Sequence, residues 1–256
     1  MTALLPEEFL RRFARAERVV AFTGAGVSAE SGVPTFRGAE GIWKKFKPEE
    51  LATMSAFLRS PELVWEWYSH RKRIIAEIEP NPGHHALARL EHLFPHFALI
   101  TQNIDNLHRR SGSRTVYELH GNIERNYCVK CGAPFSNAVV LRASGVPRCD
   151  RCGGTVRPDV VWFGESLPEE QWDLSLRAAQ SAEVFLSIGT SGVVYPAASL
   201  PLQAKRSGAY LVEINPEPTP LTDVADLFLQ GRSGEILPAL LEGVERIRSA
   251  ESRGME

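Results

Sequence analysis

The stretch from Val19 to Arg37 constrains the fold of this chain more than any other. It opens with an apolar, β-branched run typical of a buried strand, breaks at Gly24-Ala25-Gly26, and continues into small residues that suit a helix start. Gly24, Gly26 and Ala29 match the spacing G-x-G-x-x-G/A, in which backbone approaches a pyrophosphate closely and helix N–H groups face the anion. The stretch therefore predicts a phosphate-binding turn.

The segment after this turn departs from a simple dinucleotide-binding fold. Such a fold places an acidic residue about 20 positions further on, for the ribose. Here the chain instead runs into Pro34-Thr35-Phe36-Arg37 and then a Trp-rich segment. The glycine spacing alone is also compatible with a turn that binds nothing. We therefore expect a fold related to dinucleotide-binding proteins that is not a plain dehydrogenase half.

Composition narrows the possible partners. The chain has 256 residues, of which 23% are charged and 43% hydrophobic, and its net charge is −2. This balance is that of a globular protein and gives no reason to expect direct nucleic-acid or membrane binding. No apolar run approaches the roughly 18 residues of a membrane span, and the N-terminus does not resemble a secretory signal. We expect a cytoplasmic protein, and a monomer because the termini are short.

Predicted strands and helices alternate along the chain, which indicates an α/β fold with a doubly wound, parallel, Rossmann-like sheet. Aromatic residues among charges after residue 38 suggest a small helical insertion, with Pro48 and Pro61 as helix starts. Ligands of such sheets bind outside the carboxyl ends of the strands. The predicted strands are 19–23, 97–101, 115–119, 160–163, 184–188, 209–214 and 227–229, and the other predicted helices are 6–17, 84–94, 167–180, 196–206 and 234–248.

All four cysteines fall in two C-x₂-C pairs with 17 residues between them. This spacing is typical of a Cys₄ zinc ribbon, and each pair is followed by glycine, as in turns that aim N–H groups at sulfur. Four protein ligands leave no open coordination position, so the zinc is predicted to be structural. Two disulfides are the alternative. The predicted ligands are Cys128, Cys131, Cys149 and Cys152.

Polar side chains follow two of the predicted strands. His120 ends one strand, where a neutral imidazole can act as a general base near pH 7, although a lone histidine is more often structural. Asn103 and Asp105 end another, where an amide and a carboxylate can bind a carboxamide and ribose hydroxyls. Asp105 alone is also compatible with a helix N-cap.

Taken together, these motifs resemble those of the sirtuin family, the NAD-dependent protein-lysine deacylases, and in particular the subgroup that removes succinyl and malonyl groups. They run in the family's order over roughly residues 18 to 240. The matching motifs are Gly24-Ala25-Gly26-Val27-Ser28 through Arg37, Thr101-Gln102-Asn103-Ile104-Asp105, Leu119-His120-Gly121, the four cysteines, Val161-Trp162-Phe163-Gly164-Glu165, Gly189-Thr190-Ser191 and Asn215.

The resemblance implies three parts: an NAD-binding Rossmann-like domain (1–37, 81–120 and 158–256), a helical insertion (38–80) and a zinc-ribbon module (121–157). It also implies catalytic roles for His120, as the base that deprotonates a ribose hydroxyl, and for Asn103 beside the reacting ribose. The implied cofactor-binding residues are Gly24, Ala25, Gly26, Ser28, Glu30, Thr35, Phe36, Arg37, Trp43, Gln102, Asn103, Ile104, Asp105, His120, Gly189, Thr190, Ser191, Asn215, Pro216, Glu217 and Ser233.

The implied substrates are acylated-lysine proteins, and the implied products are free lysine, nicotinamide and O-acyl-ADP-ribose. Tyr68 and Arg71 are three residues apart and share one helix face. In the subgroup that this pair resembles, they bind the carboxylate of succinyl- or malonyl-lysine, and the small Ala52 leaves room for the chain. The other implied substrate contacts are Val160, Val161, Phe163, Gly164, Glu165, Gly192 and Val193.

Three other functions remain compatible with parts of this pattern. A mono-ADP-ribosyltransferase would cleave NAD in the same way and use a different acceptor. A non-catalytic NAD sensor would not need His120, Asn103 and Asp105 together. An ordinary NAD dehydrogenase is disfavoured by the missing acidic residue and by the Pro34–Arg37 loop.

Overall fold

A computed structural model describes residues 5–34 and 48–253 of the chain. Its larger part is built on a six-stranded sheet in the order β3-β2-β1-β7-β8-β9, in which every neighbouring pair is parallel. This confirms the predicted doubly wound sheet. Its strands are β1 (Arg18–Thr23), β2 (His96–Thr101), β3 (Val116–Glu118), β7 (Val184–Ile188), β8 (Tyr210–Asn215) and β9 (Leu227–Gln230).

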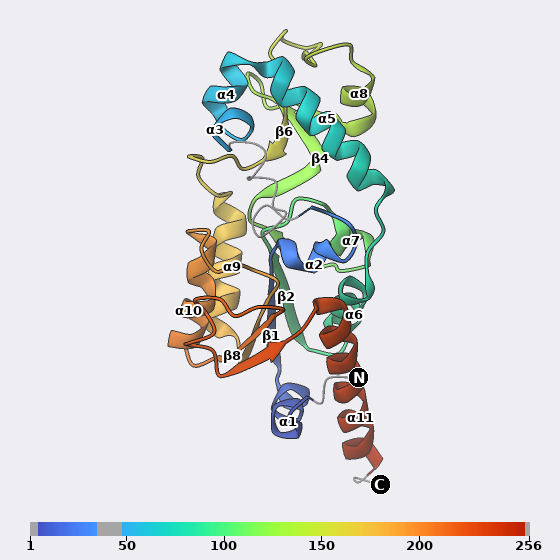
Figure 1. Ribbon diagram of the computed structural model, residues 1–256, viewed down its shortest axis with the longest axis vertical. Coiled ribbons are helices and arrows are strands. Elements are labelled where there is room, and N and C mark those ends of the chain that lie inside the picture. The colour runs from blue at the N-terminus through green and yellow to red at the C-terminus, as the bar shows by residue number, and fades with distance from the viewer. Residues whose placement is uncertain (1–4, 35–47, 254–256) are drawn as a thin grey trace.

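Helices cover both faces of this sheet (Figure 1). Because side chains alternate along a strand, Val19 and Ala21 of β1 pack into one hydrophobic cluster, whereas Val20 and Phe22 pack into another. The first cluster lies against α1 (Glu7–Arg15), α6 (Pro82–Glu91) and α11 (Ser233–Arg253), and the second against α9 (Glu169–Ser181) and α10 (Leu200–Arg206). The short helices α2 (Ala25–Ala29) and α7 (Leu107–Arg110) follow β1 and β2.

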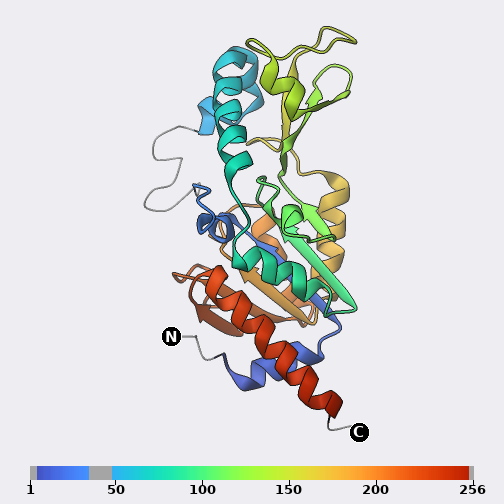
Figure 2. The ribbon, with the colours of Figure 1, turned by 90° about the vertical axis from the view of Figure 1, so that its right-hand side faces the viewer.

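A smaller domain lies at the other end of the molecule (Figure 2). Among the residues that the structure describes, it contains an antiparallel sheet in the order β5-β4-β6 and four helices. A third hydrophobic cluster lies in this domain and joins Phe57 and Trp65 from the helices to Ile123 and Val156 from the strands. The predicted helical insertion and the predicted zinc-ribbon module therefore share one core. Its elements are β4 (Gly121–Cys128), β5 (Pro134–Ser136), β6 (Val156–Val160), α3 (Pro48–Leu51), α4 (Met54–Arg59), α5 (Pro61–Glu77) and α8 (Asn137–Arg142).

Two predicted elements differ in the structure. The extended run expected at 160–163 is wrong in position, because β6 spans Val156–Val160 and pairs with β4 between Gly121 and Cys128. The helix expected at 196–206 begins as a 3₁₀ turn, Ala197–Ser199, before α10, which has a proline in its first turn. No helix in the described part of the chain is long and apolar enough to cross a membrane.

Two histidines are buried side by side behind the strand ends. The rings of His84 and His108 are 4.9 Å apart, and neither side chain is more than 2% exposed. The Asn81 N–H donates to Nδ1 of His84 (3.3 Å), which therefore stays unprotonated, and Nε2 is 3.4 Å from the Ser28 hydroxyl. Burial lowers the pKa of His84 to about 4.

This burial predicts an acid-sensitive fold. The folded pKa of His84 is about 4, whereas an unfolded histidine titrates near 6.5, so the unfolded chain gains protons first as the pH falls. The stability that His84 contributes is fully present above about pH 6.5 and declines toward pH 4. Between pH 7 and 5 the loss from His84 should be about 2 kcal/mol at about 1.4 kcal/mol per pKa unit.

The test compares urea unfolding of the wild type and His84→Gln at pH 7 and pH 5. Glutamine keeps an acceptor for the Asn81 N–H and does not titrate. The wild type should lose about 2 kcal/mol more than the variant over this range. An equal loss of unfolding free energy in the two proteins would contradict the assignment of this acid sensitivity to His84.

Candidate active site

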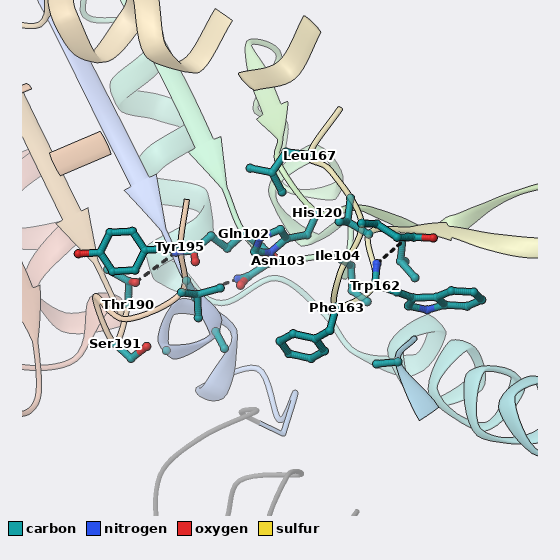
Figure 3. A pocket seen from close by; sticks show the side chains of 18 of the residues that line it. Gln102, Asn103, Ile104, His120, Trp162, Phe163, Leu167, Thr190, Ser191 and Tyr195 are labelled. Carbon is teal, nitrogen blue, oxygen red and sulfur yellow. Dashed lines mark hydrogen bonds between the residues drawn. The ribbon is translucent and has the colours of Figure 1, made fainter. Parts of the chain in front are cut away.

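A cavity of about 450 Å³ opens at the carboxyl ends of β1, β2 and β7, where the large sheet meets the small domain. Figure 3 shows Gln102, Asn103 and His120 between Thr190 on one side and Trp162 on the other. The cavity thus collects residues from both domains. The predicted site residues that line it are Gly24, Ala25, Gly26, Ala52, Tyr68, Arg71, Gln102, Asn103, Ile104, His120, Val160, Val161, Phe163, Gly164, Glu165, Gly189, Thr190, Ser191, Asn215 and Glu217.

The glycine turn after β1 meets the turn after β7 at very close range. The Gly26 N–H donates to the Gly189 carbonyl at 2.8 Å. A Cβ on Gly24 would lie 2.8 Å from the Gly189 oxygen, and one on Gly26 would lie 2.7 Å from the Gly189 Cα. No side chain fits in either place. The glycine spacing is thus required by the contact between the two turns, and it leaves the backbone of both turns at the cavity wall.

Amide side chains connect the strand ends across the sheet. Asn103 donates from Nδ2 to the Gly24 carbonyl (3.0 Å) and to the Ser28 hydroxyl (3.1 Å). Gln102 donates to the Thr190 hydroxyl (3.1 Å), and the carbonyl of Thr190 accepts from Asn215 (2.9 Å). These bonds tie the ends of β1, β2, β7 and β8 into one rigid polar floor. Ser28 lies immediately behind this floor and does not line the cavity.

His120 presents a defined tautomer to the cavity. Its Nδ1 is 3.0 Å from the carbonyl oxygen of Gln102, and because a carbonyl only accepts, Nδ1 carries the hydrogen. In the neutral ring, Nε2 then holds the lone pair. Burial lowers the pKa of His120 below its ordinary value, opposed by the hydrogen bond to Gln102. The ring is therefore neutral at pH 7 and able to take a proton at Nε2.

The small domain supplies the far end of the cavity. Ala52, Trp67, Tyr68 and Arg71 line it together. Arg71 is 7% exposed, and its guanidinium carbon lies 4.8 Å from the centre of the Trp67 ring. Burial lowers the pKa of Arg71, but an arginine stays charged. This end of the cavity therefore carries a buried positive charge.

The segment after β6 is fixed to both ends of the site. The Val161 N–H donates to the carbonyl of His120, and the Phe163 N–H donates to the carbonyl of Ala52, each at 2.9 Å. The carboxylate of Glu165 accepts from Arg157 (2.9 Å) and from the Trp162 N–H (2.8 Å). The Glu165 side chain thus shapes its own loop. Phe163 is 47% exposed at the cavity.

The other predicted residues lie away from the cavity or outside the described ranges. Asp105 is buried, which raises its pKa, and its Oδ1 accepts from the Leu107 N–H at 3.0 Å. Glu30 accepts from the Ser233 hydroxyl (3.1 Å) and the Gly234 N–H (2.9 Å), so it caps the start of α11. The structure does not place Pro216, Gly192 or Val193 on the cavity wall. The predicted residues outside the described ranges are Thr35, Phe36, Arg37 and Trp43.

The four cysteine sulfurs form one cluster, as predicted. All four Sγ atoms lie within 4.8 Å of one another. Cys128 and Cys152 are 3.5 Å apart and Cys131 and Cys149 are 3.7 Å apart, so each close contact joins the two C-x₂-C pairs. A tetrahedral zinc with bonds of about 2.3 Å separates its sulfurs by about 3.8 Å, whereas a disulfide measures about 2.05 Å. The cluster fits a structural zinc.

Comparison with known proteins decides the family. The model of the family described as "Sir2 family" matches residues 24–196 of this chain. The chain belongs to the Sir2 family. A Pyrobaculum aerophilum protein named NAD-dependent protein deacylase 2 is 54% identical over 91% of this chain and 93% of its own length. This confirms that the sequence motifs resemble those of NAD-dependent deacylases of the Sir2 family.

Solved structures of Sir2 proteins share the fold over almost the whole chain. The structure of a Sir2 homologue in complex with NAD is 46% identical and has a TM-score of 0.90, covering 95% of each chain. The structure of another Sir2 protein, bound to a myristoylated histone peptide, is 36% identical with a TM-score of 0.78, covering 95% of this chain and 98% of that one.

Several residues that line the cavity of this Sir2-family chain were not predicted from the sequence. Val194, Tyr195 and Pro196 follow Gly189-Thr190-Ser191 directly, so the rule that ligands meet strand ends could have extended the site to them. Trp67 precedes the predicted Tyr68, and Leu167 was assigned only to a helix. Trp162 lies within a recognised motif. The cavity residues that were not predicted are Trp67, Trp162, Leu167, Val194, Tyr195 and Pro196.

The cysteine cluster predicts that zinc stabilises the small domain. Cys131→Ser removes one thiolate at an exposed position, so little apolar packing is lost. We expect the bound zinc, measured by elemental analysis, to fall from one equivalent to a small fraction, and the thermal midpoint to drop by several degrees. Ser144→Ala, at an exposed serine of the same module, is the control. Full zinc occupancy in Cys131→Ser would contradict a Cys₄ site.

Proposed function

We propose that this protein removes acyl groups from protein lysines with NAD as co-substrate and releases nicotinamide and O-acyl-ADP-ribose. The observation that carries the proposal is the position of His120, a neutral base in a cavity that is lined by the glycine turns of the large sheet and by Ala52, Tyr68 and Arg71 of the small domain. Relatives at about half identity are named NAD-dependent protein deacylase, and a Sir2 protein has been solved with an acylated peptide.

The residues at the large-sheet end of the cavity have different roles toward NAD. When bound, NAD supplies a ribose carbon from which nicotinamide can leave. The turns at Gly24 and Gly189 present backbone to the pyrophosphate, and Asn103 is held rigidly beside the site where the ribose would react. His120 takes a ribose hydroxyl proton at Nε2.

The acyl-lysine enters from the small-domain side. The segment Val160–Glu165 offers backbone to the peptide, and its Val161 and Phe163 N–H groups are already used to fix it to His120 and Ala52. Apolar walls around the acyl chain exclude water from the reacting atoms. The acyl group is thereby presented directly to the side of the cavity that holds His120.

We also propose that the enzyme acts in the cytoplasm as a monomer. We further propose that its chain divides into an NAD-binding domain, a helical insertion and a zinc-ribbon module at the bounds expected from the motifs. Four cysteines gathered in a zinc-compatible cluster suit a reducing compartment.

Removing the imidazole tests the catalytic assignment. His120→Ala should lower kcat for deacylation by about 10²-fold or more, because general-base catalysis is typically worth that much. NAD affinity, measured by calorimetry, should stay within a few-fold, because the backbone turns remain. His92→Ala, at an exposed histidine that follows α6 and does not line the cavity, serves as the control. Turnover near the wild-type rate in His120→Ala would exclude this mechanism.

We further propose that carboxylate-bearing acyl chains, succinyl and malonyl, are substrates alongside acetyl. A guanidinium can pair with a carboxylate through two hydrogen bonds, and the guanidinium of Arg71 is buried at the cavity wall. Arg71 lines the cavity beside Tyr68 and the small Ala52. A neutral acetyl group makes no comparable contact.

The test compares Arg71→Met with Arg73→Met, which removes an exposed arginine from the same helix. Arg71→Met should lower kcat/KM for a succinyl-peptide about 10-fold or more, since hydrogen bonds to charged groups are worth about 1.5–3 kcal/mol. The value for the acetyl-peptide should change little, and Arg73→Met should leave both unchanged. An equal loss for the two peptides in Arg71→Met would exclude the acidic-acyl proposal.

A further inference from the structure

The hydroxyl of Tyr68 has an unusual partner. Trp162 is 2% exposed and donates from its indole Nε1 to the Tyr68 hydroxyl oxygen at 2.8 Å. An indole N–H can only donate, so the Tyr68 oxygen must accept in this bond. The hydroxyl hydrogen of Tyr68 is therefore available for another acceptor. Burial raises the pKa of Tyr68 to about 12, so this hydrogen is retained at neutral pH.

The indole of Trp162 is held on several sides. The guanidinium carbon of Arg157 lies 3.5 Å from the centre of its ring, and Arg157, which is 1% exposed, is paired with Glu165. The carboxylate of Glu165 also accepts from the backbone N–H of Trp162 (2.8 Å). The ring of Phe57 packs nearby, with centres 5.1 Å apart. Trp162 is thus locked by packing and by an ion pair, and its N–H direction is fixed.

The geometry leads to a role in substrate selection. Tyr68 and Arg71 both line the acyl end of the cavity. We propose that Trp162 is a specificity-determining residue, because its indole N–H makes the Tyr68 hydroxyl a hydrogen-bond donor toward acyl chains that end in a carboxylate. An ionised carboxylate accepts hydrogen bonds and donates none. It receives one from Tyr68 and others from Arg71, whereas a terminal methyl group receives none.

This inference rests on the proposed removal of acidic acyl groups and adds a residue to it. Trp162 contributes through Tyr68, so it is a positioning residue. Its effect on the preference for acidic acyl chains requires the Tyr68 hydroxyl to donate a hydrogen bond. A purely structural role of Trp162 would affect acidic and neutral acyl chains alike. The matched probes are succinyl- and butyryl-lysine peptides, which have acyl chains of the same length with and without the carboxylate.

The experiment measures kcat/KM for both peptides at saturating NAD in the wild type and in Trp162→Phe, which keeps an aromatic ring and removes the donor. The ratio of succinyl to butyryl activity should fall about five-fold, the typical worth of one hydrogen bond. If the phenylalanine variant does not fold, benzothienylalanine at position 162, in which sulfur replaces the N–H, makes the same test with the ring shape preserved. An unchanged ratio in the folded variant overturns the inference.

A double-variant cycle identifies the route of the effect. In a Tyr68→Phe background the hydroxyl is gone, so adding Trp162→Phe should leave the succinyl-to-butyryl ratio where Tyr68→Phe put it. A further five-fold fall in that background would overturn the inference, because Trp162 would then act without Tyr68.

Arg71→Met distinguishes the role of Trp162 from the proposed activity on acidic acyl groups. If Arg71→Met lowers succinyl activity selectively and Trp162→Phe leaves the ratio unchanged, the acidic-acyl proposal stands and only the role of Trp162 is overturned. If the wild type shows no activity on the succinyl-peptide, both are overturned.

Discussion

His120 is fixed at the joint between the two domains, and the geometry of the site depends on that joint. It stands between β3, an edge strand of the large sheet, and β4, the central strand of the small one. Its ring donates to Gln102 on the large-sheet side, and its carbonyl accepts from Val161 on the small-domain side. The imidazole is therefore positioned by both domains, and a shift of either domain would move it relative to the rest of the cavity.

The small domain buries two arginines, Arg157 and Arg71, in different surroundings. Arg157 lies outside the cavity lining and is neutralised by Glu165, and the pair stiffens the loop that carries Trp162 and Phe163. Arg71 lies on the cavity wall, stacked on Trp67. The first arginine therefore has a structural role and the second faces the ligand space. Local stiffness and the proposed recognition of acidic acyl groups thus fall to different residues of the same domain.

The sequence predicted those features that depend on local pattern. The apolar runs located the strands, the glycine spacing located the turn after β1, and cysteine spacing located the metal cluster. It misplaced β6 because Arg157-Pro158-Asp159 looks polar, although pairing with β4 and stacking on Trp162 bury Arg157. It could not assign the bond between Trp162 and Tyr68, because 94 residues separate the two in the chain.

Some residues that match the family motifs serve the fold as well. Glu30 caps the start of α11, which is a contact across about 200 residues of sequence that no motif reveals. Gly24 and Gly26 are required by the close contact between the turns after β1 and β7, independently of any bound phosphate. Motif position alone therefore does not separate cofactor contacts from structural ones, and the role of each residue has to be tested one at a time.

The most direct test of the account is product analysis with an acyl-lysine peptide and NAD. The account predicts that nicotinamide, deacylated peptide and O-acyl-ADP-ribose appear in equal amounts and that no NADH forms. Nicotinamide release with ADP-ribose attached to protein and the acyl group still on lysine would contradict it in favour of a transferase. Formation of NADH would contradict it in favour of a dehydrogenase.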